Sequence, residues 1–441
     1  MAKRFLVLAL IAVLAIGVLP TVSAQEGEGA WCGTDQPVNL TFIAGTVGGE
    51  HEVYVALAER FMAEACPNVT VKVVEWPEST TETLAQYQQF FEGESAELDV
   101  LMVDVAWPAM LAEHLLDISE YADAELLSRF YPAVLEAYTV QGRLVSFPWF
   151  AGGGMLYSRT DLLEKYGYDG PPQTWAELTE MAQTIQDGER AAGNPDFWGF
   201  VWQGNSYEGL TCDALEWVYS NGGGTIVSPD GVITIDNPAA IEAIEMAASW
   251  VGTISPSAVT SFGEEEARNM WQAGNAAFMR NWPYAYAVGN APDSAIAGLF
   301  DVAPLPAGAA GHGAAALGGW LLGVSRYSAN PEVAADVALF LASPEEQKVR
   351  AVEGSMAPTI MSLYEDQEVL EAVPFFDRMY DVFINAVARP STVTAPNYAQ
   401  VSQAFFTAVH DVLTGSETAA NALAIAADDI QAITGLELGQ P

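Results

Sequence analysis

Basic residues are scarce in this chain. Its 441 residues include 16 lysines and arginines against 57 aspartates and glutamates, so the formal net charge is −41 at pH 7. A surface with this balance repels nucleic-acid phosphates and anionic lipid headgroups. We therefore expect no nucleic-acid partner and no attachment to a membrane surface. Because the acids are scattered along the chain, we interpret them as a solvated surface suited to a salty or acidic medium.

Metal-ligating and nucleophilic motifs are also missing. The four histidines follow no ligand spacing, and the sequence has no serine-hydrolase motif and no phosphate-binding loop. We expect no metal site, no cofactor and no catalytic residue.

The three cysteines are an odd number. Cys32 and Cys66 each precede an alternating apolar run, NLTFIAG and VTVKVVEW. If these runs are neighbouring parallel strands, both thiols lie at the same edge of a sheet, where a disulfide fits an oxidising compartment. Cys212 would then remain a buried free thiol.

The one long apolar run is at the N-terminus. Lys3 and Arg4 precede the run from Phe5 to Leu19, and Val22-Ser23-Ala24 follows it. This order predicts a cleavable signal over residues 1–24, because a membrane span requires roughly 18 apolar residues. We expect an exported protein, periplasmic or extracellular, without a lipid anchor.

The rest of the chain contains enough hydrophobic residues to form a core. Roughly 415 residues, too many for one hydrophobic core, indicate at least two domains. Strand-like runs alternate with helical patterns near Glu50 to Glu64, near Thr80 to Glu92 and after Pro108, which indicates an α/β fold with a largely parallel sheet. The stretch RLVSFPWFAGGG predicts a crossing into a second domain, and later strand-like returns predict a hinge of several strands.

Two carboxylates follow predicted strands. Ligands gather at the carboxyl ends of parallel strands, where Asp104 ends LDVLMVD and Glu50 follows the first strand. Asp104 is either a ligand-binding residue, with Trp107 beside it, or the cap of the helix at Pro108. Glu50 either faces a cleft or complements the start of a helix.

Aromatic residues gather in the stretch FMRNWPYAY, with Trp282 and Tyr284, and in LGGW, where Trp320 follows Gly319. Such rings are either core or flat binding walls. A sugar stacks its apolar face on a ring and donates its hydroxyls to carboxylates. Arg389 supplies donors to such a ligand or forms a structural salt bridge. Rings beside acids therefore indicate a sugar site.

Longer blocks carry a resemblance to a known family. In order from about residue 40 to 430 the chain reads VDVAW, WGFVWQG, SYEGLTCDALEWVYSNGG, AAFMRNWPYA, LGGW and NAVARP. It resembles the trehalose/maltose-binding branch of the family 1 extracellular solute-binding proteins of ABC importers. The resemblance implies a type II periplasmic-binding-protein fold with two α/β lobes, each a mainly parallel sheet flanked by helices, joined by a multi-strand hinge. It implies an N-terminal lobe of residues 38–147 plus 288–342 and a C-terminal lobe of residues 148–287 plus 343–435.

The resemblance also implies a site. The sugar-binding residues expected from the family pattern and from the rings are Glu50, Asp104, Trp107, Phe150, Tyr207, Trp282, Tyr284, Gly319, Trp320 and Arg389. One family carboxylate is missing, because Phe150-Ala151-Gly152 stand where relatives have Tyr-x-Asp. We therefore expect a wider and less polar mouth, and we leave the identity of the sugar open.

The expected function is a non-enzymatic sugar receptor. It would close on a di- or oligosaccharide and deliver it, as a monomer, to the transmembrane permease of an ABC importer. A secreted glycoside hydrolase is the alternative, with Glu50 and Asp104 as its two carboxyl groups. A third reading keeps the fold and replaces the sugar with a polyamine.

Overall fold

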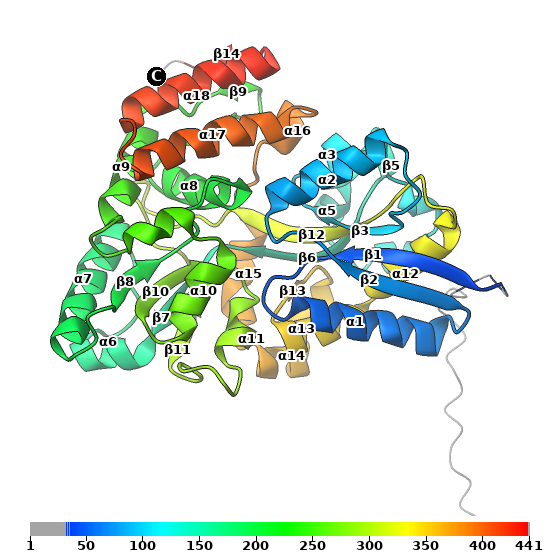
Figure 1. The fold of residues 1–441 in the computed structure, drawn as a ribbon, viewed down its shortest axis with the longest axis horizontal. Helices are drawn as coiled ribbons and strands as arrows, with labels where there is room; N and C mark the ends of the chain where they lie inside the picture. Colours follow the sequence, from blue (N-terminus) through cyan, green and yellow to red (C-terminus); the bar gives the residue numbers. More distant parts are fainter. Residues whose placement is uncertain (1–31, 33, 35, 440–441) are drawn as a thin grey trace, which may run out of the picture. The chain divides into compact units, whose positions relative to one another are not determined.

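The computed structural model describes residues 32, 34 and 36–439 (Figure 1). The predicted signal at residues 1–24 lies outside the described residues. Within the described part, no helix combines the length and hydropathy of a membrane span.

The first lobe is built on a six-stranded sheet. Its strand order is β13-β6-β12-β3-β1-β2, with the bounds β1 Val38–Ala44, β2 Val69–Glu75, β3 Val100–Asp104, β6 Phe147–Gly153, β12 Leu317–Val324 and β13 Ala357–Pro358. The helices that flank it are α1 Glu50–Arg60, α2 Thr80–Glu92, α3 Pro108–Leu111, α4 Ala124–Leu127, α5 Pro132–Ala137, α12 Pro331–Leu341 and α13 Pro344–Gly354. Shorter elements are the π-helical turn Phe61–Ala65, the 3₁₀ turns Ile118–Glu120 and Met361–Tyr364, and the hairpin β4 Thr139–Val140 with β5 Arg143–Leu144.

The second lobe is built on a four-stranded sheet of order β11-β7-β10-β8. Its strands are β7 Met155–Arg159, β8 Trp198–Val201, β10 Ala276–Asn281 and β11 Phe300–Ala303, and β9 Val232–Ile233 pairs separately with β14 Glu437–Leu438. The helices are α6 Thr160–Tyr166, α7 Trp175–Ala191, α8 Glu208–Ser220, α9 Pro238–Trp250, α10 Glu264–Gln272, α11 Ala285–Gly289, α14 Gln367–Ala372, α15 Phe376–Ile384, α16 Ser391–Thr394, α17 Tyr398–Leu413 and α18 Ala419–Thr434, with a 3₁₀ turn at Ser257–Ser261.

Local sequence explains where several helices begin. Ser79 precedes α2, and its hydroxyl accepts a hydrogen bond from the N–H of Glu82. Asn237 precedes α9 in the same role and is followed by Pro238, whose fixed φ suits the first helical position. The bounds of α2 agree with the helix expected there from sequence. The two-lobed α/β fold is confirmed.

The sheets are mixed rather than mainly parallel, which corrects the sequence prediction. In the first sheet β1 pairs in parallel with β2 and β3, but β12 is antiparallel to both β3 and β6. In the second sheet β7 is antiparallel to β10 and β11. The reversed strands are β7, which continues directly from β6, and β12, which returns from the other lobe, because each of them runs against the direction of the βα units in its sheet.

Part of the expected division of the chain also differs from the structure. Residues 288–342 were assigned to the N-terminal lobe, yet β11 pairs with β7, and the buried Phe300 and Val302 pack in the core of the second lobe. The assignment of residues 343–435 to the C-terminal lobe fails at β13, which pairs with β6. These segments are short and were not recognisable as strands of either sheet. The expected start of the C-terminal lobe at residue 148 also fails, because β6 Phe147–Gly153 belongs to the six-stranded sheet of the first lobe, and so does the assignment of α13, which flanks that sheet. The other boundaries stay predictions.

A disulfide joins Cys32 to Cys66, with their Cα atoms 5.7 Å apart. Strands β1 and β2 follow these residues and run in parallel register from Val38 opposite Val69. The disulfide therefore ties the start of the first strand to the start of its neighbour. Cys212 is a buried free thiol.

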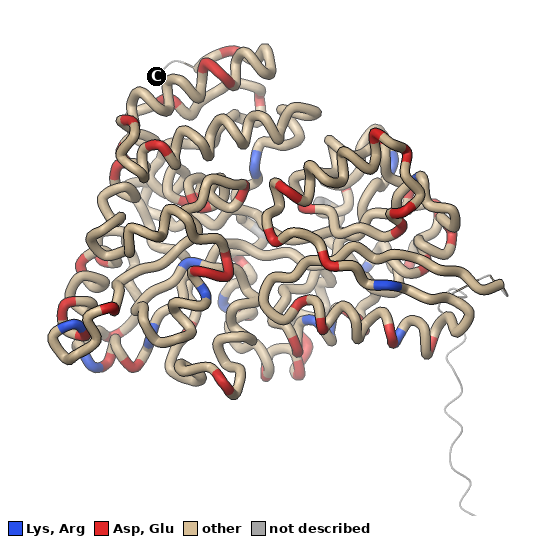
Figure 2. Tube along the Cα trace, viewed as in Figure 1, with Lys and Arg blue, Asp and Glu red and all other residues tan. Residues whose placement is uncertain are grey.

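Charged side chains are distributed over both lobes. Figure 2 shows aspartates and glutamates on many helices and loops, with few lysines or arginines between them. Several arginines depart from this surface pattern, and one of them, Arg280 on β10, is buried with 1% of its surface exposed.

Arg280 connects the second lobe to the point where the chain passes between the lobes. Its Nε and Nη2 donate to the two carboxylate oxygens of Glu216 at 2.9 and 2.6 Å, and its Nη1 lies 3.2 Å from Asp213. Glu216 also accepts the backbone N–H of Ala316, next to β12, at 3.0 Å. The guanidinium carbon lies 4.0 Å from the centroid of the Trp282 ring. Two buried carboxylates and one strand connection thus depend on one cation.

Removing the disulfide should destabilise the first lobe. The cross-link spans 34 residues, for which loop-closure entropy gives a stabilisation of about 4 kcal/mol. We expect Cys32→Ser with Cys66→Ser to lower the free energy of unfolding in urea by about 3–4 kcal/mol. Dithiothreitol should destabilise the unaltered protein in the same way and leave the double variant unchanged. Equal midpoints with and without the reductant would contradict the prediction.

Replacing Arg280 with methionine should destabilise the protein by about 3–5 kcal/mol, because it leaves buried carboxylates without their cation. The matched control is Arg378→Met, since Arg378 pairs with Asp301 with both side chains about half exposed and should cost less than about 1 kcal/mol. Urea unfolding of both variants measures the difference. Equal losses would show that burial of the Arg280 pair does not matter.

Candidate ligand-binding cavity

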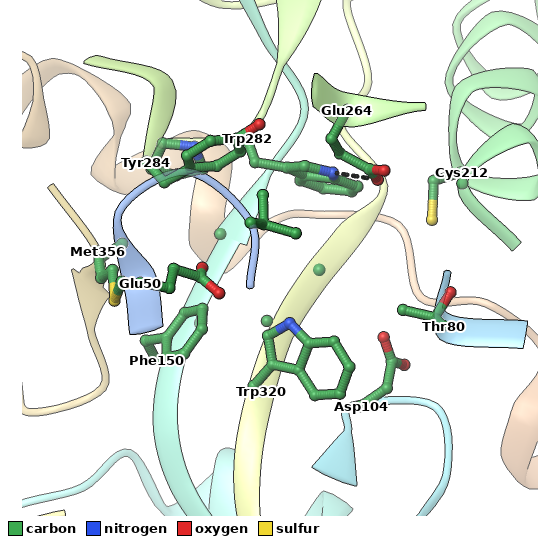
Figure 3. A pocket seen from close by; sticks show the side chains of 18 of the residues that line it. Glu50, Thr80, Asp104, Phe150, Cys212, Glu264, Trp282, Tyr284, Trp320 and Met356 are labelled. Carbon is green, nitrogen blue, oxygen red and sulfur yellow. Dashed lines mark hydrogen bonds between the residues drawn. The ribbon is translucent and has the colours of Figure 1, made fainter. Parts of the chain in front are cut away.

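A cavity lies between the two lobes. The space between its side chains amounts to about 780 Å³, including the part open to solvent. The first lobe lines it with Val47, Glu50, Glu78, Thr80, Asp104, Phe150, Ala151, Gly152, Gly318, Gly319, Trp320, Met356 and Ala357, and the remaining lining residues are Glu208, Gly209, Cys212, Glu264, Trp282, Pro283, Tyr284 and Arg389. Figure 3 shows rings and carboxyl groups from both lobes facing this space.

The aromatic stretch after β10 forms one wall. The Trp282 ring packs so closely on Gly318 that an added Cβ there would lie 2.6 Å from a ring carbon. A Cβ on Gly152 would lie 3.0 Å from the Pro283 ring. Consecutive residues of the second lobe therefore rest on bare backbone of β12 and β6. Side chains at these two glycines would push the wall away from the strands.

The opposite wall carries Trp320 and Phe150, which are register partners on β12 and β6. Gly319 has φ +127°, and a Cβ at this position would lie 2.4 Å from the carbonyl oxygen of Phe150. Only glycine fits this backbone conformation, which brings Trp320 to the cavity. Trp107 does not line the cavity; its buried ring packs edge-on against the Trp320 ring with the centroids 5.5 Å apart. It supports the wall from behind.

The expected wider and less polar mouth is not present at Gly152. The Pro283 ring fills the space that a side chain would take there. Other carboxyl groups, from Glu78, Glu208 and Glu264, line the cavity in addition to those predicted. At Gly152, where the family carboxylate is missing, Pro283 of the second lobe packs against the strand.

Glu50 is the first residue of α1, and its side chain lines the cavity. It is 6% exposed, and burial raises its pKa to about 8, with Glu265 and Glu264 raising it further against the opposing effects of Tyr54 and Arg350. At neutral pH Glu50 is therefore a protonated carboxyl group that both donates and accepts hydrogen bonds. From the sequence, this carboxyl group is expected only to accept hydrogen bonds.

Asp104 and Arg389 form a buried ion pair. Arg389 Nη2 donates to Asp104 Oδ1 at 2.7 Å, and its Nη1 donates to Glu208 Oε1 at 2.8 Å. Asp104 Oδ1 also accepts the N–H of Ala106 at 2.8 Å, so Asp104 caps this turn while α3 begins behind Trp107. Within the described residues the second oxygen of Asp104 has no hydrogen-bond partner. Arg389 thus fixes Asp104 and leaves one carboxylate oxygen for a ligand.

Tyr207 lies behind the cavity wall rather than in it. It precedes α8, is 6% exposed, and its hydroxyl donates to Glu264 at 2.5 Å. The second oxygen of Glu264 accepts the indole N–H of Trp282 at 3.2 Å. Tyr284 is likewise held from outside, by its hydroxyl bond to Glu265 at 2.8 Å.

The structure thus brings eight predicted site residues to one cavity and leaves Trp107 and Tyr207 behind its walls. Sequence reasoning missed Glu78, Thr80, Glu208 and Glu264. Glu208 and Glu264 begin helices α8 and α10, and a glutamate there reads as an ordinary helix start. Glu78 and Thr80 lie at the β2–α2 turn, at the carboxyl edge of the sheet, and this position was the available signal.

Ionisation of Glu50 should make stability depend on pH. The folded protein holds this proton up to about pH 8, whereas the unfolded chain releases it near pH 4.5, so unfolding becomes easier as pH rises between these values, by at most about 1.4 kcal/mol per unit. We expect Glu50→Gln to flatten this decline and to be more stable than the unaltered protein at pH 8.

Urea unfolding at pH 5 and pH 8 measures the effect. The exposed Glu52 lies on the same helix, so Glu52→Gln is the control and should retain the decline of the unaltered protein. Parallel pH profiles for the Glu50 variant and the unaltered protein would contradict the prediction.

Known proteins resemble this chain in sequence and architecture. A model of the family described as bacterial extracellular solute-binding protein matches residues 48–348. A probable ABC transporter-binding protein of Deinococcus radiodurans is 53% identical over 377 residues, covering 86% of this chain and 89% of that protein. The maltose-bound MalE3 of T. maritima has a TM-score of 0.85 at 40% identity, covering 90% of this chain and 100% of that one. The GacH receptor of Streptomyces glaucescens GLA.O, solved unliganded and with acarbose, has a TM-score of 0.78 at 26% identity, covering 91% and 99%.

The family match spans more than half of the chain, and the relative from Deinococcus radiodurans extends over most of both sequences. The maltose-bound structure agrees in both lobes. This chain therefore belongs to the bacterial extracellular solute-binding proteins.

Proposed function

We propose that the protein binds a di- or oligosaccharide of the glucose type in the cavity and delivers it to the permease of an ABC importer. One observation carries this proposal. The rings of Trp282 and Trp320 and the carboxyl groups of Glu50 and Asp104 line a single cavity between the lobes. Flat apolar faces beside oxygen acceptors complement a sugar ring and its hydroxyls.

The relatives support a sugar of the maltose type. MalE3 of T. maritima was solved with maltose and the GacH receptor with acarbose. A polyamine is disfavoured because a positively charged residue, Arg389, lines the same cavity. Arg389 is buried beside Asp104 and would repel a cationic ligand. The family consists of binding proteins, and nothing in the relatives favours the glycoside hydrolase alternative.

The fold supplies a route for closure. The chain passes from β6 into β7 and from β11 towards β12, so short strand connections join the lobes. Hinge closure around a ligand is the standard motion of such folds. In this proposal the segment at residues 1–24 is removed on export, and the mature monomer works in the periplasm or outside the cell. Its permease partner would recognise the closed form.

A sugar panel tests the proposal directly. Glucose, trehalose, maltose and maltotriose are titrated into the protein while tryptophan emission and heat are recorded, with spermidine as the cationic comparison. We expect saturable binding of at least one of the longer sugars and none of spermidine. Mass spectrometry of each sugar after incubation should show it intact. Binding of spermidine alone, or shortened sugar products, would overturn the proposal.

The Trp282 ring should contribute measurably to affinity. Losing one large buried ring contact costs about 1–3 kcal/mol, so Trp282→Ala should weaken sugar binding by about 5- to 150-fold in calorimetry. Trp198→Ala is the matched control, because Trp198 lies on β8 outside the cavity, under the guanidinium of Arg190 at 4.3 Å. Unchanged affinity in the Trp282 variant would place the sugar elsewhere.

A further inference from the structure

Glu264 is a carboxylate of the cavity wall whose side-chain hydrogen bonds, among the residues that the structure describes, come from the second lobe. It is the first residue of α10. The indole N–H of Trp282 donates to its Oε1 at 3.2 Å, and the hydroxyl of Tyr207 donates to its Oε2 at 2.5 Å. Two donors on two different oxygens fix both the position and the plane of the carboxylate. The group is therefore in place before any ligand arrives.

The carboxylate retains capacity to accept further hydrogen bonds. An ionised carboxylate offers about four lone-pair positions, and the protein uses two of them here. Figure 3 shows the group beside the indole nitrogen of Trp282, on the side of the cavity where Cys212 lies. Because Glu264 lines the cavity, a ligand in this space reaches the remaining positions.

The charge of Glu264 is held without a salt bridge. Within the described part of the chain, no lysine or arginine forms an ion pair with it, whereas Asp104 and Glu208 share Arg389. The N-terminus of α10 stabilises its negative charge instead. Hydrogen bonds to a charged acceptor are stronger than those between neutral groups, so a ligand hydroxyl gains more at Glu264 than at a neutralised acid.

We propose that Glu264 accepts a hydrogen bond from a hydroxyl group of the bound sugar and so selects for that hydroxyl. This rests on the proposed function. Glu50 and Asp104 approach the ligand from the first lobe, and Glu264 approaches it from the second. A sugar that lacks the selected hydroxyl can form hydrogen bonds with the carboxyl groups of the first lobe but not with Glu264. Recognition of this hydroxyl is therefore completed only when the lobes are closed.

The first experiment compares two variants that remove the same charge from the same helix. Glu264→Gln should weaken binding of maltose about 10- to 100-fold, the size of one hydrogen bond to a charged group. Glu266→Gln is the control, because Glu266 is exposed and bonds to the backbone N–H of Gly263 at 2.9 Å, which glutamine also does. If maltose is not bound, the tightest sugar of the panel takes its place.

The second experiment separates a ligand contact from mere positioning of Trp282. Maltose derivatives that each lack one hydroxyl are titrated into the unaltered protein and into the Glu264→Gln variant. A direct contact predicts non-additive losses, so one derivative should bind the two proteins about equally. If Glu264 only orients the ring, the variant should lose the same factor with every derivative, and the inference is wrong.

The outcomes also distinguish the inference from the function beneath it. If the Glu264 variant binds maltose with unchanged affinity, the inference is wrong. The proposed function still stands in that case, as long as the unaltered protein binds a sugar. A loss of equal size in the Glu266 control shows that general charge, and not this contact, is responsible, and also overturns it. No binding of any sugar by the unaltered protein overturns both.

Discussion

The buried guanidinium of Arg280 is the interaction on which the cavity and the passage between the lobes both depend. It pairs with Glu216 and Asp213 inside the second lobe and lies against the face of the Trp282 ring. Through Glu216 it also holds the backbone of Ala316, beside the strand that re-enters the first lobe. A lysine would not serve equally, because the planar fork of arginine meets both oxygens of Glu216 and still stacks on the indole. The ring wall is thus tied to the core and not to a loop.

Burial assigns different chemistry to acids that look alike in sequence. Glu50 and Glu264 each begin a helix and each line the cavity. Glu50 is enclosed, and desolvation raises its pKa to about 8. Glu78, at the turn before α2, has its pKa raised to about 7 by burial and by the glutamates at the start of α10. Burial also raises the pKa of Asp104, against the opposing effect of Arg389, which pairs with both Asp104 and Glu208. The cavity therefore offers a sugar both donors and acceptors from one residue type.

The features that could be predicted from the sequence are those that a local pattern of residues determines. The alternating runs that form β1 and β2, the helix at Thr80–Glu92 and the position of Asp104 at the end of β3 all follow from periodicity within a dozen residues. The antiparallel return of β12 and the membership of β11 do not, because both depend on which lobe the chain re-enters. Trp107 was expected in the site since it follows Asp104, but tertiary packing places its ring under Trp320. Glu208 and Glu264 reach the cavity through the orientation of α8 and α10, which no short motif encodes.

Cys212 lines the cavity as a free thiol, and burial raises its pKa well above the ordinary range. The thiolate is the species that attacks disulfides and binds soft metals. With its proton retained, this sulfur neither exchanges with the Cys32–Cys66 bond nor links two copies of the chain. A protein with an odd number of cysteines is thereby compatible with oxidising surroundings.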